Sequence, residues 1–394
     1  MKLQAKSSSE LNKALQKSAK CIKAKNFLPV LNNALLTVKG EQFYLTTSTG
    51  DAQLTVPVPF SLVDGKLAEP LAIPVNLIMP FLATLPDCTV TFTFEEQTNA
   101  LHMEYCTSGG GKTKEGKVSL TYFDGKEFPI LSPLKADPTH IAIPMETLDK
   151  ATKGCADFVS NNELRPQMCC LCIDIAEDLS DVSFVATNGQ MLYRHTHTNN
   201  PNTGGSNFYR SGAPGTILIH SGNFRTFTAF EGCEAVDVES DGGMVRLSSP
   251  DGIELVCKSV EQRYPNYKAI IPKGSPNYIC FDRKEMLATL KRVSIFSDKT
   301  ANLMTLTKSG MFLDVAVKDV EYSRSAEDQV TIAEASCAEG FCIGFNVAVL
   351  TSALNAIDGD TVRFGFSDQS HATVFTEDTP SPSTLALCMP MLVQ

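Results

Sequence analysis

The chain has 394 residues, of which 43% are hydrophobic and 20% are charged, and its formal net charge is −10. This length and composition predict two to four folded domains with apolar cores, and they exclude a largely disordered protein. The negative charge by itself argues against a protein that coats nucleic acid electrostatically, and no apolar run reaches membrane-spanning length.

The N-terminal stretch "MKLQAKSSSELNKAL" lacks the apolar core of a secretory signal, so we expect a cytoplasmic protein. The 13 cysteines are scattered along the chain. In a protein that is not secreted, we expect the cysteines to be reduced and to act as small, buried apolar residues. We expect no bound metal or cofactor.

Three segments of the chain share one pattern, in which a helix is followed by strands. They begin at residues 7, 144 and 282, and Leu11, Leu148 and Met286 take equivalent places, 137 and 138 residues apart. Each segment has a second half in which a short helix precedes strands of alternating polarity, such as "AVDVES" and "TVRFGF". This regularity predicts an internal threefold repeat.

The ends of the repeats also match, because "EFPIL", "RYPNY" and "CMPML" follow equivalent strands. The apolar tail "LALCMPMLVQ" is therefore expected to be a final strand or a docked extended segment. The predicted fold class is α+β, with three similar domains of two helices packed on antiparallel sheets. Boundaries are expected at proline-marked stretches, which gives domains 1–135, 136–272 and 273–394.

The first helix of each repeat is predicted to carry cations opposite its buried stripe. The stripes are expected to be Leu11, Ala14, Leu15, Ser18 and Ile22; Leu148, Thr152 and Cys155; and Met286, Leu290 and Val293. The lysines opposite them are Lys13, Lys17, Lys20, Lys150, Lys153, Lys284 and Lys291. They are either solvated surface residues or parts of one basic surface that faces phosphates.

An ordered set of motifs resembles the bacterial DNA polymerase sliding clamps, the beta subunits of replicative polymerases. "KNFLPVLNNALLTV" resembles the signature of the first domain, and "ELRPQMCCLCIDI" with "FVATNGQML" resembles that of the second. "RYPNYKAIIP" resembles the end of the second domain, and "GFNVAVLTSALNAI" with the terminal "MPM" resembles the third. The resemblance covers the whole chain in order.

The resemblance implies a non-catalytic processivity factor with no catalytic residues. Two subunits would close head to tail into a homodimeric ring of six domains around duplex DNA, which is held without sequence preference. Lys25 matches a DNA-contacting position of the family, and otherwise it is a loop lysine in water. The subunit interface is expected near "TVTFTF" (89–94) of one copy and "VAVKDV" (315–320) of the other.

The family also binds short peptides of the polymerase alpha subunit, the clamp loader and repair polymerases in an apolar groove. By resemblance the groove here comprises Met168, Thr187, Gly189, Leu192, Pro265, Ile270, Leu387, Met389, Pro390 and Met391. Methionines offer an adaptable surface to many partners, and a glycine permits close backbone approach. The alternative for each apolar member is ordinary core packing.

The sequence departs from the family at "NGQML", where Asn188, Gln190 and Met191 replace an acid, an imidazole and a guanidinium. The groove should therefore carry less charge than usual. An alternative function is a paralogue that keeps the fold as a peptide-binding scaffold without sliding on DNA. A third is a thiol or metal enzyme that uses the cysteines.

Three motifs are expected to be structural rather than catalytic. "SGGGKTKEG" has Cys106 where a phosphate-binding loop needs its first glycine, so it is predicted to be a flexible hairpin loop. The thiols of "CCLC" (Cys169, Cys170 and Cys172) should alternate along a buried strand without a second ligand pair at zinc spacing. His195 and His197 should share one face of a strand, at the surface.

Overall fold

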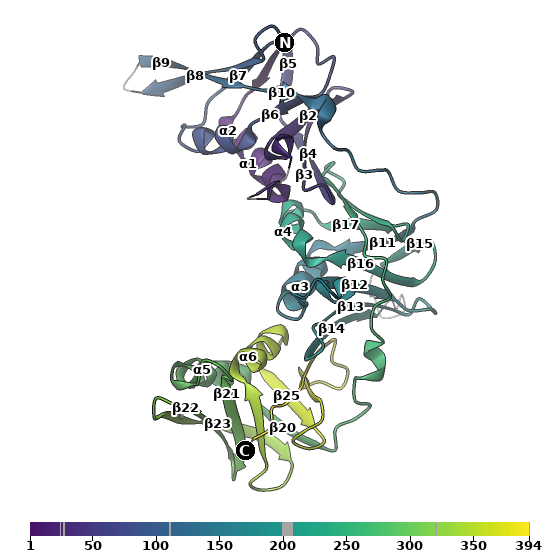
Figure 1. Ribbon diagram of the computed structural model, residues 1–394, viewed down its shortest axis with the longest axis vertical. Coiled ribbons are helices and arrows are strands. Elements are labelled where there is room, and N and C mark those ends of the chain that lie inside the picture. Colours follow the sequence, from purple (N-terminus) through teal and green to yellow (C-terminus); the bar gives the residue numbers. More distant parts are fainter. Residues whose placement is uncertain (24, 27, 110–111, 199–207, 320, 394) are drawn as a thin grey trace. The chain divides into compact units, whose positions relative to one another are not determined.

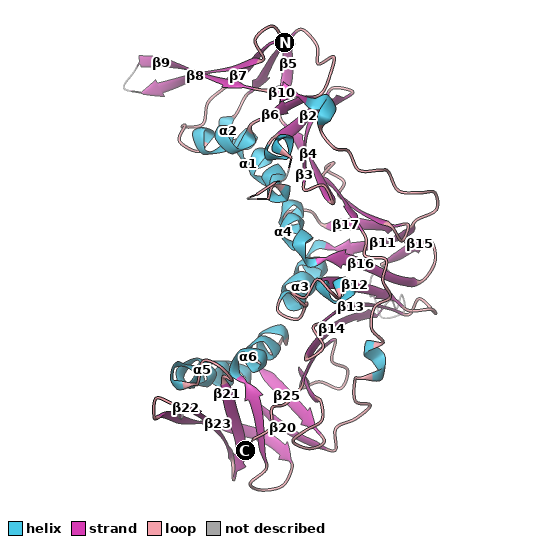
Figure 2. Cartoon of the chain, in the orientation of Figure 1, coloured by secondary structure: helices cyan, strands magenta, loops and turns pink. Residues whose placement is uncertain are grey.

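The computed structural model describes residues 1–23, 25–26, 28–109, 112–198, 208–319 and 321–393. Within these residues one unit, a strand, a helix and three strands, occurs six times, twice in each third of the chain (Figures 1 and 2). All strand pairs among them are antiparallel. The predicted α+β class with two helices per repeat is confirmed.

The first third contains two of these units. Its elements are β1 (Lys2–Ala5), α1 (Ser8–Ser18), η1 (Ala19–Cys21), η2 (Pro29–Asn32), β2 (Ala34–Lys39), β3 (Gln42–Ser48), β4 (Ala52–Val58) and β5 (Ser61–Asp64). They are followed by β6 (Leu71–Ile73), α2 (Val75–Leu82), β7 (Val90–Glu95), β8 (Ala100–Gly109), β9 (Lys112–Thr121), β10 (Phe123–Asp124) and η3 (Gly125–Glu127).

The second third repeats the pattern with a shorter second helix. Its elements are β11 (Thr139–Pro144), α3 (Met145–Ala156), η4 (Pro166–Cys169), β12 (Cys170–Ile175), β13 (Asp181–Thr187), β14 (Met191–Thr198) and β15 (Tyr209–Ser211). The second unit has β16 (Gly215–His220), η6 (Ser221–Asn223), α4 (Phe224–Phe227), η7 (Thr228–Phe230), β17 (Ala235–Ser240), β18 (Met244–Ser248), β19 (Glu254–Lys258) and η8 (Tyr267–Ala269).

The last third ends on the strand that the repeat predicts. Its elements are β20 (Asn277–Asp282), α5 (Arg283–Val293), η9 (Ser294–Phe296), β21 (Leu303–Ser309), β22 (Phe312–Asp319) and β23 (Arg324–Ser336). The second unit has β24 (Cys342–Asn346), α6 (Val347–Ala356), β25 (Thr361–Phe366), β26 (Thr373–Glu377) and β27 (Thr384–Cys388).

The strands form three sheets, and two of them continue from one repeat into the next. A ten-stranded sheet has the order β10-β6-β2-β3-β4-β19-β18-β17-β11-β15, so β4 of the first repeat pairs with β19 of the second. A twelve-stranded sheet has the order β16-β12-β13-β14-β27-β26-β25-β20-β23-β22-β21-β24, so β14 pairs with β27. The third sheet has the order β5-β1-β7-β8-β9.

Polar residues begin three of the helices. The side chain of Ser7 accepts a hydrogen bond from the backbone N–H of Glu10 (3.1 Å) at the start of α1, and that of Asp282 accepts one from Glu285 (2.7 Å) at α5. Asn346 accepts from Ala348 at α6. Each cap satisfies an N–H that the first helical turn would leave unpaired.

The predicted helix stripes are largely correct. Leu11, Leu148 and Met286 each take the fourth position of their helix, and each is fully buried. Two members of the stripes are wrong, because Ala14 and Thr152 are only half-buried, whereas Ala151 is buried. The buried line of α3 is therefore Leu148, Ala151 and Cys155, which differs from the expected line only in its middle member.

The chain divides into two compact units, and the middle third contributes to both. One unit comprises residues 1–149, 209–213 and 222–259, and the other comprises residues 150–208, 214–221 and 260–394. The expected boundaries after residues 135 and 272 fall in connections between repeats and stay predictions. Among the described residues, no helix is long and apolar enough to span a membrane.

Candidate functional site

The apolar tail is held by strand pairing, as expected. β27 lies between β14 and β26, and Leu387 pairs with Leu192 across the β14–β27 ladder. Both leucines are almost fully buried. For these two residues the core-packing alternative describes the structure, and they form the floor of the candidate site rather than its accessible surface.

A tight turn next to this ladder requires a glycine. Gly189 has a φ of +91°, a region that side chains with a Cβ rarely adopt. The Thr187 hydroxyl donates to the Met191 carbonyl across the turn (2.7 Å) and accepts from the Gly189 N–H (3.1 Å). A Cβ at Gly189 would lie 3.4 Å from Cε of Met168, which is itself buried. The turn thus brings three predicted groove residues together.

The connection that follows β19 covers the same apolar cluster. Tyr264 and Tyr267 are buried in a cluster with Leu192 and Leu387, and Ile271 packs against it. The neighbouring Ile270 exposes 52% of its surface. Pro265 is half-buried, and its carbonyl accepts from the Tyr267 N–H. The two tyrosines were not predicted as site residues, although they lie in the "RYPNY" motif.

The residues after β27 run as an extended segment with two further backbone hydrogen bonds. The Met389 N–H donates to Gln190 (3.0 Å), and the Met391 N–H donates to Gly344 of β24 (2.8 Å). A Cβ at Gly344 would lie 2.8 Å from the Met391 carbonyl oxygen, so the tail can dock only against a glycine. Met389 is 42% exposed, and Pro390 and Met391 are half-buried.

The ten predicted groove residues therefore fall into two groups. Met168, Thr187, Leu192 and Leu387 are buried supports, whereas the others have exposed or half-exposed surface. Leu392 and Val393, which were not predicted, are also exposed, at 80% and 43%. An exposed apolar strip beside a ready-made turn can bind an extended peptide through apolar anchors.

The predicted basic residues lie on the first helices or next to them. Lys13 and Lys17 are on α1, Lys20 is in η1, and Lys25 is exposed in the connection before η2. Lys150 and Lys153 are on α3, and Lys284 and Lys291 are on α5. None of the eight is buried, so each is available to an anion at least in part.

Two of these lysines are already paired with carboxylates. Lys150 forms an ion pair with Asp358, and Lys284 lies 2.7 Å from Asp360. The carboxylate of Asp360 raises the pKa of Lys284. By contrast, Lys13, Lys20, Lys25 and Lys291 form no ion pair with the described residues. The second group should therefore contribute more to a phosphate interaction than the first.

The structural motifs turn out partly as predicted. Lys112 and Lys114 of the glycine-rich stretch lie on β9, which pairs with β8, so this stretch belongs to a hairpin. Cys169 is not on a strand, since it ends η4 and only Cys170 and Cys172 lie on β12. His195 is not at the surface, because it is 8% exposed and contacts Thr384 of β27 (3.0 Å). The sequence pattern could not reveal that β14 has a neighbour on both sides.

The burial of His195 predicts acid sensitivity. Burial, together with the nearby charge of Lys150, lowers the pKa of His195 from 6.5 to about 4, and Asp358 opposes this shift only in part. The neutral form therefore stabilises the fold fully above pH 6.5. That stability is lost as the pH falls towards 4, by up to about 3 kcal/mol. We expect urea unfolding to show a smaller loss between pH 7.5 and 4.5 for His195→Asn than for the natural protein. An equal loss would contradict the prediction.

The buried thiols do not support a thiol enzyme. Burial raises the pKa of Cys21 to about 11 and that of Cys257 to about 12, and it also raises the pKa of Cys388. A cysteine nucleophile needs a lowered pKa and access to substrate. These residues act as small apolar side chains in the core, as the sequence predicts.

Family models match the two ends of the chain, and known proteins match nearly its whole length. The model for the N-terminal domain of the DNA polymerase III beta subunit matches residues 1–132, and the model for its C-terminal domain matches residues 268–392. The chain belongs to the DNA polymerase III beta subunit family. The beta sliding clamp of Synechocystis is 23% identical over 381 residues, which is 93% of this chain and 94% of that protein.

Solved structures of the family share the fold. The beta subunit of Streptococcus pyogenes superposes with a TM-score of 0.86 at 18% identity, and both chains are covered completely. The Pseudomonas aeruginosa clamp, solved with bound griselimycin, superposes with a TM-score of 0.85 at 20% identity, again with both chains covered completely. The clamp fold of this family member is therefore established along the entire chain.

Asn188, Gln190 and Met191, the departures that the sequence resemblance implies, lie in or next to the turn before β14. Asn188 uses its side-chain carbonyl oxygen to accept from the backbone of both Gln190 and Met191 (2.9 Å each), so it holds the turn as an aspartate would. Gln190 is exposed and Met191 is buried. Asn188 thus holds the turn without contributing a charge beside the tail.

Proposed function

We propose that this protein is a DNA sliding clamp, a non-catalytic ring that encircles duplex DNA and tethers replication proteins to it. The observation that carries the proposal is the sheet pairing between successive repeats. β4 of the first repeat pairs with β19, and β14 of the second pairs with β27. In both cases the last strand of one repeat's first unit pairs with the last strand of the next repeat's second unit.

The same rule identifies the edges that would join two copies. The first residues of β23 pair only with β22 within the described chain, and β9 pairs only with β8. These two strands are the equivalents of β14 and β27, so β23 of one copy would pair with β9 of another. The strands expected from the sequence, β7 and β22, each have a partner on both sides; β23 lies next to β22, whereas β9 lies two strands from β7.

Apolar side chains lie beside both free edges. At the junctions inside the chain a second-half helix contacts the end of a first-half helix, as Arg225 on α4 does when it donates to the Ala19 carbonyl. By this rule α2 of one copy would face η9 of the other. Leu77 on α2 is 60% exposed, and Ile295 and Phe296 of η9 are 71% and 43% exposed. Such side chains are typical of a surface that becomes buried on association.

The lysines of the first helices are proposed to hold DNA weakly through its phosphates. A clamp must slide, so a few cations without base-specific contacts are sufficient, and salt should weaken the attraction. The overall charge of −10 would discourage DNA from binding elsewhere on the protein. The scaffold alternative is not favoured, because the relatives that match the chain end to end are beta sliding clamps.

Neutralising the unpaired lysines is expected to flatten the salt dependence of DNA binding. In the variant Lys13→Gln, Lys20→Gln, Lys25→Gln, the slope of log affinity against log salt should fall by up to about one for each lysine. Titration of short duplex DNA at several salt concentrations measures this slope.

The matched control for this experiment is Lys284→Gln, which removes a lysine that already pairs with Asp360. We expect its slope to change by much less than one for the single lysine removed. Equal changes per lysine in both variants would show that the ion pairs do not select the DNA-facing residues. An unchanged slope in the triple variant would favour a scaffold without a DNA role.

The exposed strip beside β27 is proposed to bind peptides of the polymerase alpha subunit, the clamp loader and repair polymerases. Its apolar floor, its methionines and its low charge support extended peptides with large apolar anchors. Different partners would then compete for one site on each subunit. The homodimer would offer two such sites.

A further inference from the structure

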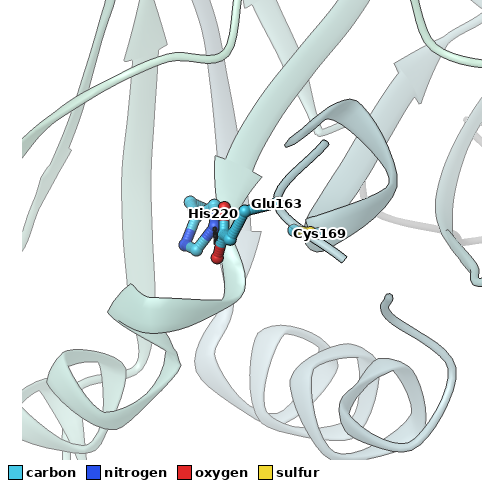
Figure 3. A group of neighbouring side chains, drawn as sticks. All are labelled: Glu163, Cys169 and His220. Atoms are coloured by element: carbon cyan, nitrogen blue, oxygen red, sulfur yellow. Dashed lines mark ion pairs between the residues drawn. The ribbon is translucent and has the colours of Figure 1, made fainter. Parts of the chain in front are cut away.

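Three side chains that commonly bind metals converge beside η4. Glu163 lies in the connection after α3, Cys169 is the last residue of η4, and His220 is the last residue of β16. One ligand atom from each lies within 4.8 Å of the other two (Figure 3). The closest pair is His220 Nε2 and Glu163 Oε1, 3.4 Å apart.

The backbone holds these residues together. β12 and β16 pair so that Cys170 lies opposite His220. Cys169 is therefore one residue away from the position opposite the imidazole. The Ser160 N–H donates to the Met168 carbonyl (2.8 Å) and closes the loop that contains Glu163. The Met168 N–H in turn donates to Arg165 (2.9 Å). The arrangement therefore depends on sheet register and turn geometry rather than on free side-chain rotation.

The ligand types favour one class of metal. A thiolate, an imidazole and a carboxylate are all zinc ligands, and soft sulfur disfavours calcium and magnesium. Zinc–ligand bonds of about 2.0–2.3 Å in a tetrahedron place ligand atoms about 3.3–3.8 Å apart. The His220–Glu163 separation already falls in this range. Small rotations of the Glu163 and His220 side chains would bring their ligand atoms to the same range of distances from the Cys169 sulfur.

We propose that Glu163, Cys169 and His220 form a binding site for Zn²⁺ or a similar divalent transition metal. Cys169 is 1% exposed and provides the inner ligand, whereas the Glu163 side chain is 70% exposed and lies on the solvent side. Three protein ligands leave a fourth position for water or for a group from another molecule. The proposal does not depend on the clamp function.

Metal binding at the cluster would have to displace the proton of the Cys169 thiol. Burial raises the pKa of the Cys169 thiol, and the neighbouring Glu163 carboxylate raises it further. A divalent ion between the two would relieve their repulsion. Met168 lies between Glu163 and Cys169 in the sequence, and its Cε would lie 3.4 Å from a Cβ at Gly189. A bound metal would therefore also help to fix Met168 against the turn beside the tail.

The test uses cobalt(II) as a coloured substitute for zinc, added to the full-length protein. We expect one equivalent to bind with a thiolate-to-cobalt charge-transfer band, and we expect zinc to displace it. Cys169→Ser should abolish the band. Loss of a ligand should weaken binding by at least about 100-fold, because second-shell changes alone cost 10- to 100-fold.

Two further sets of variants keep the test decisive. Glu163→Gln and His220→Gln should weaken cobalt binding in a protein whose core is undisturbed, since Glu163 is exposed. Cys106→Ser and His371→Gln, an exposed thiol and an exposed imidazole elsewhere, should leave it unchanged. A band that survives Cys169→Ser, or no band at all in the natural protein, would overturn the proposal and leave only a Glu163–His220 ion pair.

Discussion

Replacing Ile295 with glutamate is expected to turn the protein from a dimer into a monomer. Ile295 is 71% exposed in η9, beside the proposed β23 edge. The change would forfeit about 1.5–3 kcal/mol of apolar burial. It would also place an unpaired charge in the interface, so dimerisation should weaken by at least about 100-fold. Sedimentation and negative-stain imaging would show the loss of both the dimer mass and the ring.

The complementary face provides a second variant and a control. Leu77→Glu on α2 should have the same effect, because the proposed interface joins α2 of one copy to η9 of the other. Ile130→Glu changes a residue of similar exposure, 61%, in the connection after η3, and it should remain dimeric. If Ile295→Glu and Leu77→Glu both stayed dimeric, ring closure through these edges would be wrong. Retention on circular DNA should be lost together with the dimer.

Removing residues 389–394 is expected to abolish peptide binding while the fold stays intact. These residues follow β27, and Met389 and Leu392 are exposed at 42% and 80%. Loss of two apolar anchors of a peptide-binding site costs about 2 kcal/mol each, so affinity should fall by about 1,000-fold. Fluorescence polarisation with a labelled peptide that carries a glutamine and two large apolar residues measures this loss.

A deletion that begins two residues earlier distinguishes the loss of the peptide-binding residues from the loss of the strand that supports them. Leu387 and Cys388 belong to the buried strand β27, and Leu387→Ala alone should cost about 2–5 kcal/mol of folding stability. Deletion of 387–394 should therefore lower both peptide affinity and the unfolding temperature, whereas deletion of 389–394 should lower only affinity. Gly344→Val offers a third comparison, since its side chain would displace the Met391 backbone without changing any exposed residue of the tail. Unchanged affinity in all three variants would refute the assignment of the site.

Local patterns in the sequence were sufficient to predict the helices and the repeat. Leu11, Leu148 and Met286 mark equivalent helical positions because helix periodicity involves only near neighbours in the chain. The tail was predicted as a strand because two internal segments resemble it. On α3 the middle member of the buried line is Ala151 and not Thr152, because both i+3 and i+4 fall near one face of a helix and only the packing of the folded chain selects between them.

The sequence by itself determined the threefold repeat and the α+β class, and its motifs indicated the family and most of the candidate peptide-binding residues. Tertiary structure decided what each of these residues does. Sheet register buried Leu387 and left Met389 exposed, and it left β9 and the first residues of β23 with one strand partner each among the described residues. Folding also paired Lys150 with Asp358 and brought Glu163, Cys169 and His220 together. These outcomes depend on contacts between residues far apart in the chain, which no local pattern of polarity specifies.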